Sequence, residues 1–272
     1  MTDLTFAKNS FLQEEIQFKQ IKIEDGLSQS TILCIIQDKK GFLWFGTANG
    51  LNRYDGYNFT VFTNDPADTT SISDNGILSL YEDKDENIWI GTVEGVLNKY
   101  DKKRGIFSRY YITSLLKTDT DPDEKYYDFP LPFSRNNDKS ITSITQDKKG
   151  FLWFGTWGKG LVKYDASKNK YEHFHYNENE LNGFHSNRVK AIIADENNVI
   201  WAATLGGGLY KITTGERTSI IHYQKNSNEW SLSDNKIVSL MKDRKGNLWI
   251  GTYGSGLNKF SYQYLNIHQN LF

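Results

Sequence analysis

The chain has 272 residues, with 32 basic and 33 acidic side chains, 14% aromatic residues and only four prolines. This charge balance excludes the basic excess of a nucleic-acid-binding domain and the long acidic run of a disordered tail. The aromatic content favours strands over disorder.

Two further observations bear on the compartment. The single cysteine, Cys34, cannot form a disulfide within the chain, and the sequence has no apolar run near the roughly 20 residues of a membrane helix. The first residues lack the apolar core of a signal peptide. These features leave the compartment undetermined.

The N-terminal part is predicted to contain a tail over residues 1–15 and a lone β-strand over residues 16–23 (IQFKQIKI). Five copies of one unit follow: QDKKGFLWFGT (37–47), EDKDENIWIGT (82–92), QDKKGFLWFGT (146–156), ADENNVIWAAT (194–204) and KDRKGNLWIGT (242–252). Their tryptophans are spaced by 45, 64, 48 and 48 residues: Trp44, Trp89, Trp153, Trp201 and Trp249.

This period is typical of four-stranded propeller blades, which repeat every 40 to 50 residues or so. The sequence therefore predicts an all-β propeller over 16–272, with blades at about 31–63, 76–111, 140–176, 187–224 and 235–268. Stacked blades bury their faces against each other. We therefore expect the five tryptophans to lie in the inter-blade core and Cys34 to be a buried, inert thiol.

Each unit predicts four antiparallel strands, a to d. A β-branched residue leads strand a, an Asp-containing turn joins it to strand b with the tryptophan, and a glycine-containing loop leads to strand c. The fourth turn position favours a positive φ, which suits Gly41, Gly150, Asn198 and Gly246, whereas Glu86 predicts a different turn in the second blade. The predicted d strands are 59–62, 107–110, 171–176, 220–223 and 264–267.

The 64-residue spacing marks an insertion over 112–139. Its acidic stretch lacks the glycine and the final glutamate of an EF-hand loop, which argues against calcium. We expect a solvated loop or a docking segment. The lone strand at 16–23 leaves two architectures open, a fragment of a longer propeller or a closed ring of five blades.

The motif QDKKGFLWFGTANGLNRYD (37–55), its four relatives and FKQIKIEDGLSQSTI (18–32) resemble the two-component regulator propeller repeat and the sensor region of bacterial hybrid two-component kinases. In that family the propellers form the extracytoplasmic input region of a membrane-anchored histidine kinase, often one that responds to glycans. The resemblance implies a sensor that signals across the membrane, with kinase activity in domains other than this propeller, with the receptor's downstream domains as partners, and with a homodimer as a further expectation.

The b–c and d–a loops share one face of a propeller, which usually carries function because its loops vary. Flat rings beside small polar groups suit sugars, so candidate ligand-binding residues are three aromatics, Trp157, Tyr253 and Trp230, joined by Phe184, His185 and Glu94. No His/Cys cluster has metal-ligand spacing and no catalytic motif stands out, so we expect no metal, no cofactor and no catalysis in this chain.

Two alternatives remain. A protein–protein scaffold would bind its partner through the insertion, and deleting 113–138 would abolish that binding. A propeller lyase or glycosidase would need acids and histidines that converge on the loop face, where Glu94 and His185 are the obvious ones.

Overall fold

The protein is described by a computed structural model over residues 18–116, 137–177, 183–214 and 218–261. These residues form five antiparallel sheets, four of them with four strands and the last with three. The first two sheets contain β1 (Ile32–Gln37), β2 (Leu43–Thr47), β3 (Gly50–Tyr54), β4 (Phe59–Phe62), β5 (Ile77–Glu82), β6 (Ile88–Thr92), β7 (Leu97–Asp101) and β8 (Ile106–Tyr110).

The other three sheets contain β9 (Ile141–Gln146), β10 (Leu152–Thr156), β11 (Leu161–Asp165), β12 (Lys170–Phe174), β13 (Val189–Ala194), β14 (Val199–Thr204), β15 (Leu209–Thr213), β16 (Ser219–Tyr223), β17 (Ile237–Lys242), β18 (Leu248–Thr252) and β19 (Leu257–Phe260). Two short 3₁₀ helices are η1 (Ile23–Asp25) and η2 (Ile112–Leu115). The all-β propeller prediction with five blades is confirmed.

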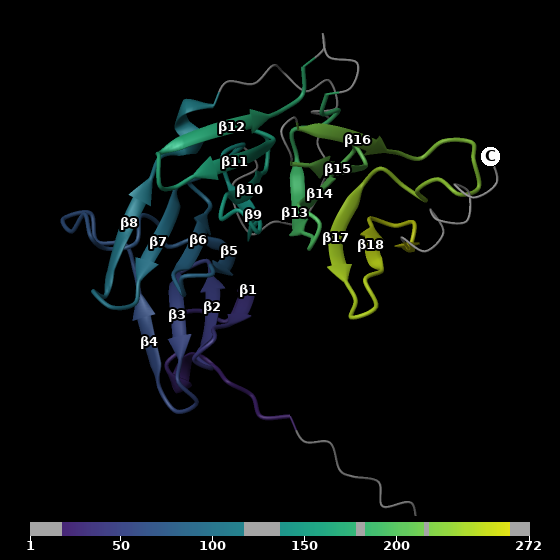
Figure 1. The fold of residues 1–272 in the computed structure, drawn as a ribbon. Coiled ribbons are helices and arrows are strands. Elements are labelled where there is room, and N and C mark those ends of the chain that lie inside the picture. Colours follow the sequence, from purple (N-terminus) through teal and green to yellow (C-terminus); the bar gives the residue numbers. More distant parts are fainter. Residues whose placement is uncertain (1–17, 117–136, 178–182, 215–217, 262–272) are drawn as a thin grey trace, which may run out of the picture.

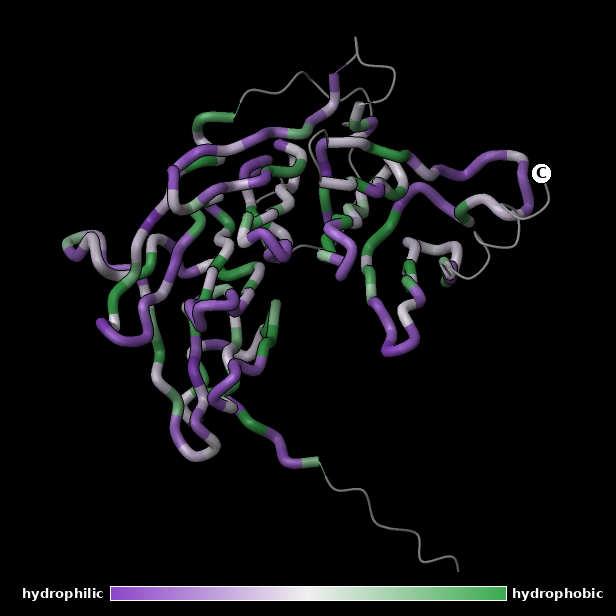
Figure 2. Tube along the Cα trace, in the orientation of Figure 1, coloured by the Kyte–Doolittle hydropathy of each residue, from purple (hydrophilic) through white to green (hydrophobic). Residues whose placement is uncertain are grey.

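The blades follow one another along an arc (Figure 1), with the a strands β1, β5, β9, β13 and β17 each packed on the next. Each a strand has a register shift after its first residue, at the same place in all five sheets. Figure 2 shows hydrophobic residues along the strands and hydrophilic residues in the turns, as expected for sheets that bury their faces against neighbouring sheets.

Neighbouring blades pack where a β-branched residue of one blade contacts a glycine of the preceding blade. A Cβ atom added to Gly46 would lie 2.7 Å from Ile77 Cγ2, and one added to Gly91 would lie 2.6 Å from Ile141 Cγ2. Both isoleucines are fully buried. The glycine of the Trp-x-Gly-Thr motif therefore allows close approach of the next blade in the first three blades, whereas Ala203 stands at this position in the fourth blade.

The blade faces at the two ends of the arc are more exposed. Ile35 on the first blade is 59% exposed, whereas Leu80 at the equivalent position of the second blade is 8% exposed. On the last blade, a Cβ at Gly251 would meet only Ser239, and Leu257 is 63% exposed. The packing that buries the interior blades is thus absent on these two faces within the described residues.

The N-terminal segment differs from the expectation. Residues 18–22 form no strand, and the chain turns through η1, where Asp25 Oδ2 accepts a hydrogen bond from Lys22 N at 2.7 Å. Residues 18–25 are exposed and pair with no sheet edge, so no ladder supports a strand there. Residues 16–17 and the predicted fourth strand of the last blade, at 264–267, lie outside the described residues.

Two further predictions concern Cys34 and the insertion. The Cys34 thiol faces the next blade, and burial raises its pKa to about 12, which keeps it unreactive. In the insertion, η2 packs on the second and third blades with Ile112 and Leu116 buried, whereas 117–136 lies outside the described residues. No helix in the described ranges is long and apolar enough to cross a membrane.

The a–b turn of the second blade does not differ from the others, contrary to the expectation. Glu86 has φ +66°, in the same region as Asn198 at +56° and Gly41 at +91°. The turn bonds repeat as well, because Glu86 N donates to Asp83 O at 3.1 Å as Gly41 N does to Asp38 O at 2.9 Å. The surrounding hairpin forces a glutamate into a conformation that disfavours side chains.

We therefore expect Glu86→Gly to raise the free energy of unfolding by about 0.5–1 kcal/mol, by relieving this backbone cost. The exposed Lys40–Glu86 contact, at 4.0 Å, contributes little to offset the gain. Urea denaturation measures the change. The reverse substitution, Gly41→Glu, serves as control and should destabilise; equal stability of Glu86→Gly and the parent would contradict the strain.

A second prediction concerns the inter-blade glycines. Gly91→Ala should lower the free energy of unfolding by about 1–3 kcal/mol, because the new methyl group would overlap Ile141. The matched variant Gly251→Ala, which meets no isoleucine of a following blade, should cost clearly less. Similar losses for the two variants in thermal denaturation would rule out blade-to-blade overlap as the cause.

Candidate functional site

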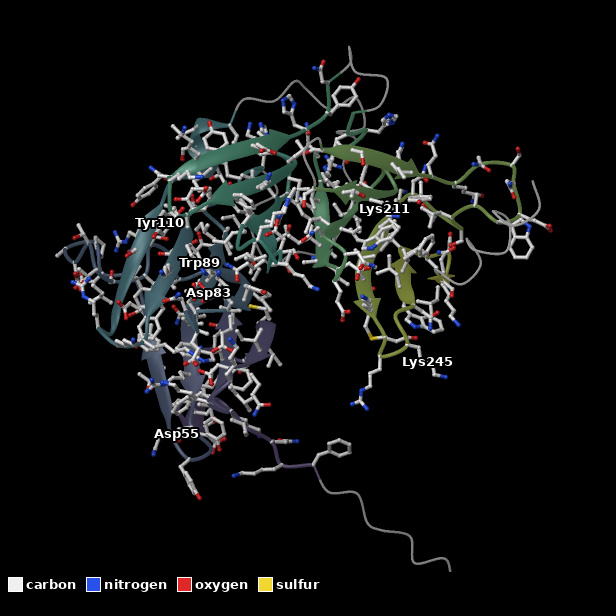
Figure 3. The ribbon with its side chains drawn as sticks, viewed as in Figure 1. Asp55, Asp83, Trp89, Tyr110, Lys211 and Lys245 are labelled. Carbon is white, nitrogen blue, oxygen red and sulfur yellow. The ribbon has the colours of Figure 1, made fainter. Side chains whose placement is uncertain are left out.

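In the first, second, third and fifth blades the turn aspartate is hydrogen-bonded to the tryptophan of its own blade. Oδ1 accepts backbone N–H groups of the turn, as Lys40 N and Phe42 N donate to Asp38 at 3.0 Å each. Oδ2 accepts the indole Nε1–H, at 3.0 Å for Asp38–Trp44, 2.7 Å for Asp83–Trp89, 3.0 Å for Asp147–Trp153 and 3.0 Å for Asp243–Trp249. Asp83 and Trp89 are labelled in Figure 3.

This arrangement satisfies a buried carboxylate and a buried indole with one bond. The expectation of core tryptophans agrees with the exposure of Trp44, Trp89, Trp153 and Trp201, at 0–2%, whereas Trp249 on the terminal face is half-buried. Sequence reasoning treated aspartate and tryptophan separately; their constant six-residue spacing was the signal that they interact.

A basic residue on strand c lies over each tryptophan. Trp89 and Lys99 are direct cross-strand partners, and Lys99 Nζ lies 5.6 Å from the ring centroid. The other pairs are Arg53–Trp44, Lys163–Trp153, Lys211–Trp201 and Lys259–Trp249. The sequence analysis missed these cation–π contacts, although a basic residue stands two positions after each strand-c leucine.

On the opposite, loop face, serine–asparagine pairs hold the d–a loops to strand c. Asn98 Nδ2 donates to Ser73 Oγ at 2.8 Å, and Ser73 N donates back to Asn98 Oδ1 at 3.0 Å. The same reciprocal bonds join Ser28 with Asn52 and Ser233 with Asn258. These pairs fix the loops of the first, second and fifth blades.

Histidines replace these pairs in the third and fourth blades. Val162 and Tyr210 occupy the asparagine position, and the strand-d residues opposite them are His173 and His222. Each ring bonds through Nε2 to a b–c loop carbonyl, that of Lys159 or Gly207.

The fourth blade carries a stack of rings at this face. Phe184 and Tyr210 stack at 4.2 Å between centroids, and Tyr210 stacks on His222 at 4.5 Å. His185 contacts His222 edge-on at 4.4 Å, and its N–H donates to the Tyr210 hydroxyl at 2.7 Å. Phe184 is 2% exposed, so its ring offers no open face to a ligand, whereas His185 is exposed.

The aromatic candidates on the fifth blade are open to solvent. Trp230 is 86% exposed and Tyr253 is 49% exposed. Asp234 Oδ2 accepts a hydrogen bond from Ser255 Oγ at 3.0 Å, which ties the two loops together. The loops that carry the two exposed rings thus also carry a hydroxyl and a carboxylate group.

The remaining candidates lie on other blades. Trp157 is half-buried in the b–c loop of the third blade, where its N–H donates to Ser140 O at 2.9 Å. Glu94 is exposed on the second blade, and its N–H donates to Asp74 Oδ2 at 3.1 Å. The six candidates are thus distributed over the loops of the second to fifth blades.

Metal chemistry finds no support among these side chains. Within the four described ranges, no three His, Cys, Asp or Glu residues come together in a group that could hold a metal ion. The sequence analysis named Phe184 and His185 but not the other two rings of the stack, Tyr210 and His222. These two come from neighbouring strands whose pairing only the fold reveals.

The structure is a β-propeller module in which the same a–b hairpin geometry recurs in all five sheets. The model of the two component regulator propeller matches residues 26–49, 71–94, 136–158 and 231–254, which include the Asp–Trp hairpins of four blades. The fourth blade, where Ala203 replaces the motif glycine, is outside these ranges. Four segments of the chain are therefore similar to the two-component regulator propeller repeat.

Individual relatives agree with this family. Histidine kinase P4 of Formosa agariphila is 54% identical over 56 residues, which are 21% of this chain and 4% of that protein. The extracellular domain of a hybrid two-component system from B. thetaiotaomicron is 26% identical with a TM-score of 0.67, over 90% of this chain and 30% of that one. The chain therefore spans only a minor part of these relatives, and it is similar to extracellular domains of two-component systems.

Propeller enzymes share the fold as well. Virginiamycin B lyase from Staphylococcus aureus is 17% identical with a TM-score of 0.55, over 84% of this chain and 68% of the lyase. At this identity the likeness shows the fold alone.

The two strand-d histidines predict a pH dependence of stability. Burial lowers the pKa of His173 and of His222 from the usual 6.5, with a further lowering by the neighbouring rings of His175 and His185. The unfolded chain then binds more protons than the folded one once the pH falls below 6.5. The free energy of unfolding should therefore be highest above pH 6.5 and should decrease as the pH drops from 6.5 toward the lowered pKa values of the two histidines.

Urea titrations at about pH 7.5 and about pH 5.5 measure this loss. His222→Gln, which retains an N–H donor, should reduce the difference between the two conditions. The aspartates with lowered pKa act only as the pH approaches 3.8, so they do not obscure the window. A pH difference unchanged in His222→Gln would exclude this histidine as a source.

Proposed function

We propose that this chain is the ligand-sensing input region of a membrane-anchored two-component histidine kinase, that it lies outside the cytoplasm, and that its loop face binds an oligosaccharide. The match to the two-component regulator propeller model and the similarity of the chain to extracellular domains of two-component systems support the sensor role. Kinase activity belongs to further domains of such a receptor. Those domains are the partners that would receive the signal, and the receptor would act as a dimer.

The observation that carries the sugar proposal is the exposure of Trp230 and Tyr253 on the two loops that the Asp234–Ser255 pair joins. A pyranose presents C–H groups on one side, which pack on an aromatic face, and hydroxyl groups at its edge, which bond to carboxylates and hydroxyls. Trp157 on the third blade would extend such a surface to a longer glycan.

Signalling requires that the ligand favour one receptor geometry over another. The Ser–Asn pairs and the inter-blade packing keep each blade rigid. A glycan that contacts loops of more than one blade would therefore bias the relative positions of whole blades and not the conformation within a blade.

The test is a thermal-shift screen of the chain against plant, mucin-type and microbial oligosaccharides. A ligand at 100 times its dissociation constant stabilises the fold by about 2.7 kcal/mol. Trp230→Ala and Trp157→Ala should each weaken the shift. Tyr57→Ala is the matched control, because Tyr57 is 89% exposed in a c–d turn on the opposite face.

A glycan that stabilises the parent and the Tyr57 variant but not the tryptophan variants would support the proposal. A shift that survives both tryptophan substitutions would refute the loop-face site. For the sensor role itself, an unchanged autophosphorylation rate of the complete receptor at saturating glycan would count against signalling.

A further inference from the structure

A cavity of about 500 Å³ lies between the second and third blades on the turn face, away from the proposed glycan surface. We call it the seam cavity. Its lining includes Asp83, Lys84, Lys99, Lys149 and Ala166. The a–b turns of both blades and the c–d turn of the third blade supply these residues.

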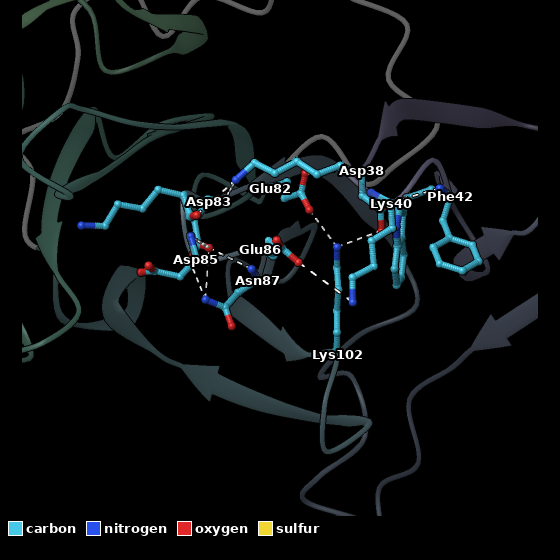
Figure 4. Close-up of polar contacts among 12 residues, drawn as sticks. Asp38, Lys40, Phe42, Glu82, Asp83, Asp85, Glu86, Asn87 and Lys102 are labelled. Carbon is cyan, nitrogen blue, oxygen red and sulfur yellow. Dashed lines mark hydrogen bonds and ion pairs between the residues drawn. The ribbon is translucent and has the colours of Figure 1, made fainter.

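The preceding seam, between the first and second blades, is closed by a lysine. Lys102 Nζ donates to Asp38 Oδ2 and to Glu82 Oε1, at 2.8 Å each, and its side chain is only 14% exposed (Figure 4). The cation neutralises two carboxylates that come from different blades.

The same bridge is missing from the next seam because both of its ends are changed. Asp101 and Asp165 end equivalent c strands, so the residue after Asp165, Ala166, takes the place of Lys102. Gln146 ends strand a where Glu82 does in the second blade, and its Oε1 accepts Lys84 N at 3.0 Å, as Glu82 Oε2 accepts Lys39 N at 2.8 Å. The backbone geometry is kept, while one cation and one anion are lost together.

Two of the three aspartates that line the cavity, Asp83 and Asp165, are hydrogen-bonded to neighbouring turn residues. Asp83 accepts hydrogen bonds from Asp85 N, Trp89 Nε1 and both the N–H and the side-chain amide of Asn87. Asp165 accepts bonds from the Ser167 and Lys168 turn, including Lys168 Nζ at 3.4 Å. Asp85 is exposed.

Three lysines of the lining lack an ion-pair partner among the described residues. Within the described residues, Lys84, Lys99 and Lys149 have no acidic side chain at ion-pair distance, and Lys99 lies over the Trp89 ring. These three lysines add positive charge to a lining in which Asp83 and Asp165 are bonded to their own turns, so the cavity attracts an anion, and the polar lining supplies further donors.

We propose that the seam cavity binds a small oxyanion, which bridges the second and third blades as the Lys102 ammonium bridges the first and second. The ligand chemistry is that of a phosphate or sulfate group, free or as the sulfate ester of a sugar. This site is independent of the loop-face glycan and would tie blade positions to the ion's concentration.

Isothermal titration calorimetry of the chain at constant ionic strength tests the site, with sodium phosphate, sodium sulfate and galactose 6-sulfate as separate probes. Lys149→Ala should weaken binding by about tenfold or more, as expected for a lost charged hydrogen bond. Lys40→Ala, which removes the lysine at the same turn position of the first blade, should leave binding unchanged.

The decisive variant is the double substitution Ala166→Lys with Gln146→Glu, which rebuilds the Lys102 bridge inside the cavity. It should abolish oxyanion binding and keep the melting temperature of the chain at or above the parent value. Tighter binding of the sugar sulfate than of free sulfate would identify the ester as the source, and equal binding would favour the free ion.

Failure is equally clear. Absence of binding heat with all three probes, or binding that persists in the double variant, would overturn the proposal. Binding of ethanolamine in place of the oxyanions would show that the lining aspartates, not the lysines, define the site. Loss of the glycan response with retained oxyanion binding would affect only the loop-face proposal.

Discussion

The hydrogen bond from the tryptophan indole to the turn aspartate is the constraint on which the first, second, third and fifth blades depend. It joins the a–b hairpin turn to the inter-blade core, because one carboxylate oxygen orders the turn amides and the other satisfies the buried indole. With the turn and the ring held together, strand b presents its glycine to the next blade, and a β-branched residue of that blade fills the space. The unit then repeats along the chain, with Ala203 in place of the glycine in the fourth blade.

Variation is confined to what surrounds this unit. On the turn face, the seams between blades are completed differently: Lys102 bridges the first and second blades, Lys242 of the fifth blade bonds to Asp195 of the fourth, and Ala166 leaves a cavity. On the loop face, Ser–Asn pairs are found in the first, second and fifth blades, and histidines replace them in the third and fourth. A constant scaffold with variable edges allows the same fold to place different chemistry on its two faces.

The two faces suit different ligands for a physical reason. The loop face displays exposed rings such as Trp230, which favours ligands with apolar surface, whereas the turn face concentrates charges, with lysines beside carboxylates already bonded to turn amides. The turn-face cavity lies at a seam between the second and third blades. A propeller of rigid sheets changes shape most easily at such seams, so ligands there can act on the positions of blades.

The sequence by itself determined the repeat, the antiparallel strands of its unit and the burial of four of the five tryptophans, because these depend on a local period and hairpin chemistry that recur along the chain. Only the tertiary structure decided four other matters. Glu86 adopts the turn of its neighbours because the hairpin overrides its preference, and residues 18–22 form no strand because no sheet edge accepts them. The Phe184–Tyr210–His222 stack and the seam cavity join residues from separate strands and blades, so their contacts depend on packing between sheets and not on spacing along the chain.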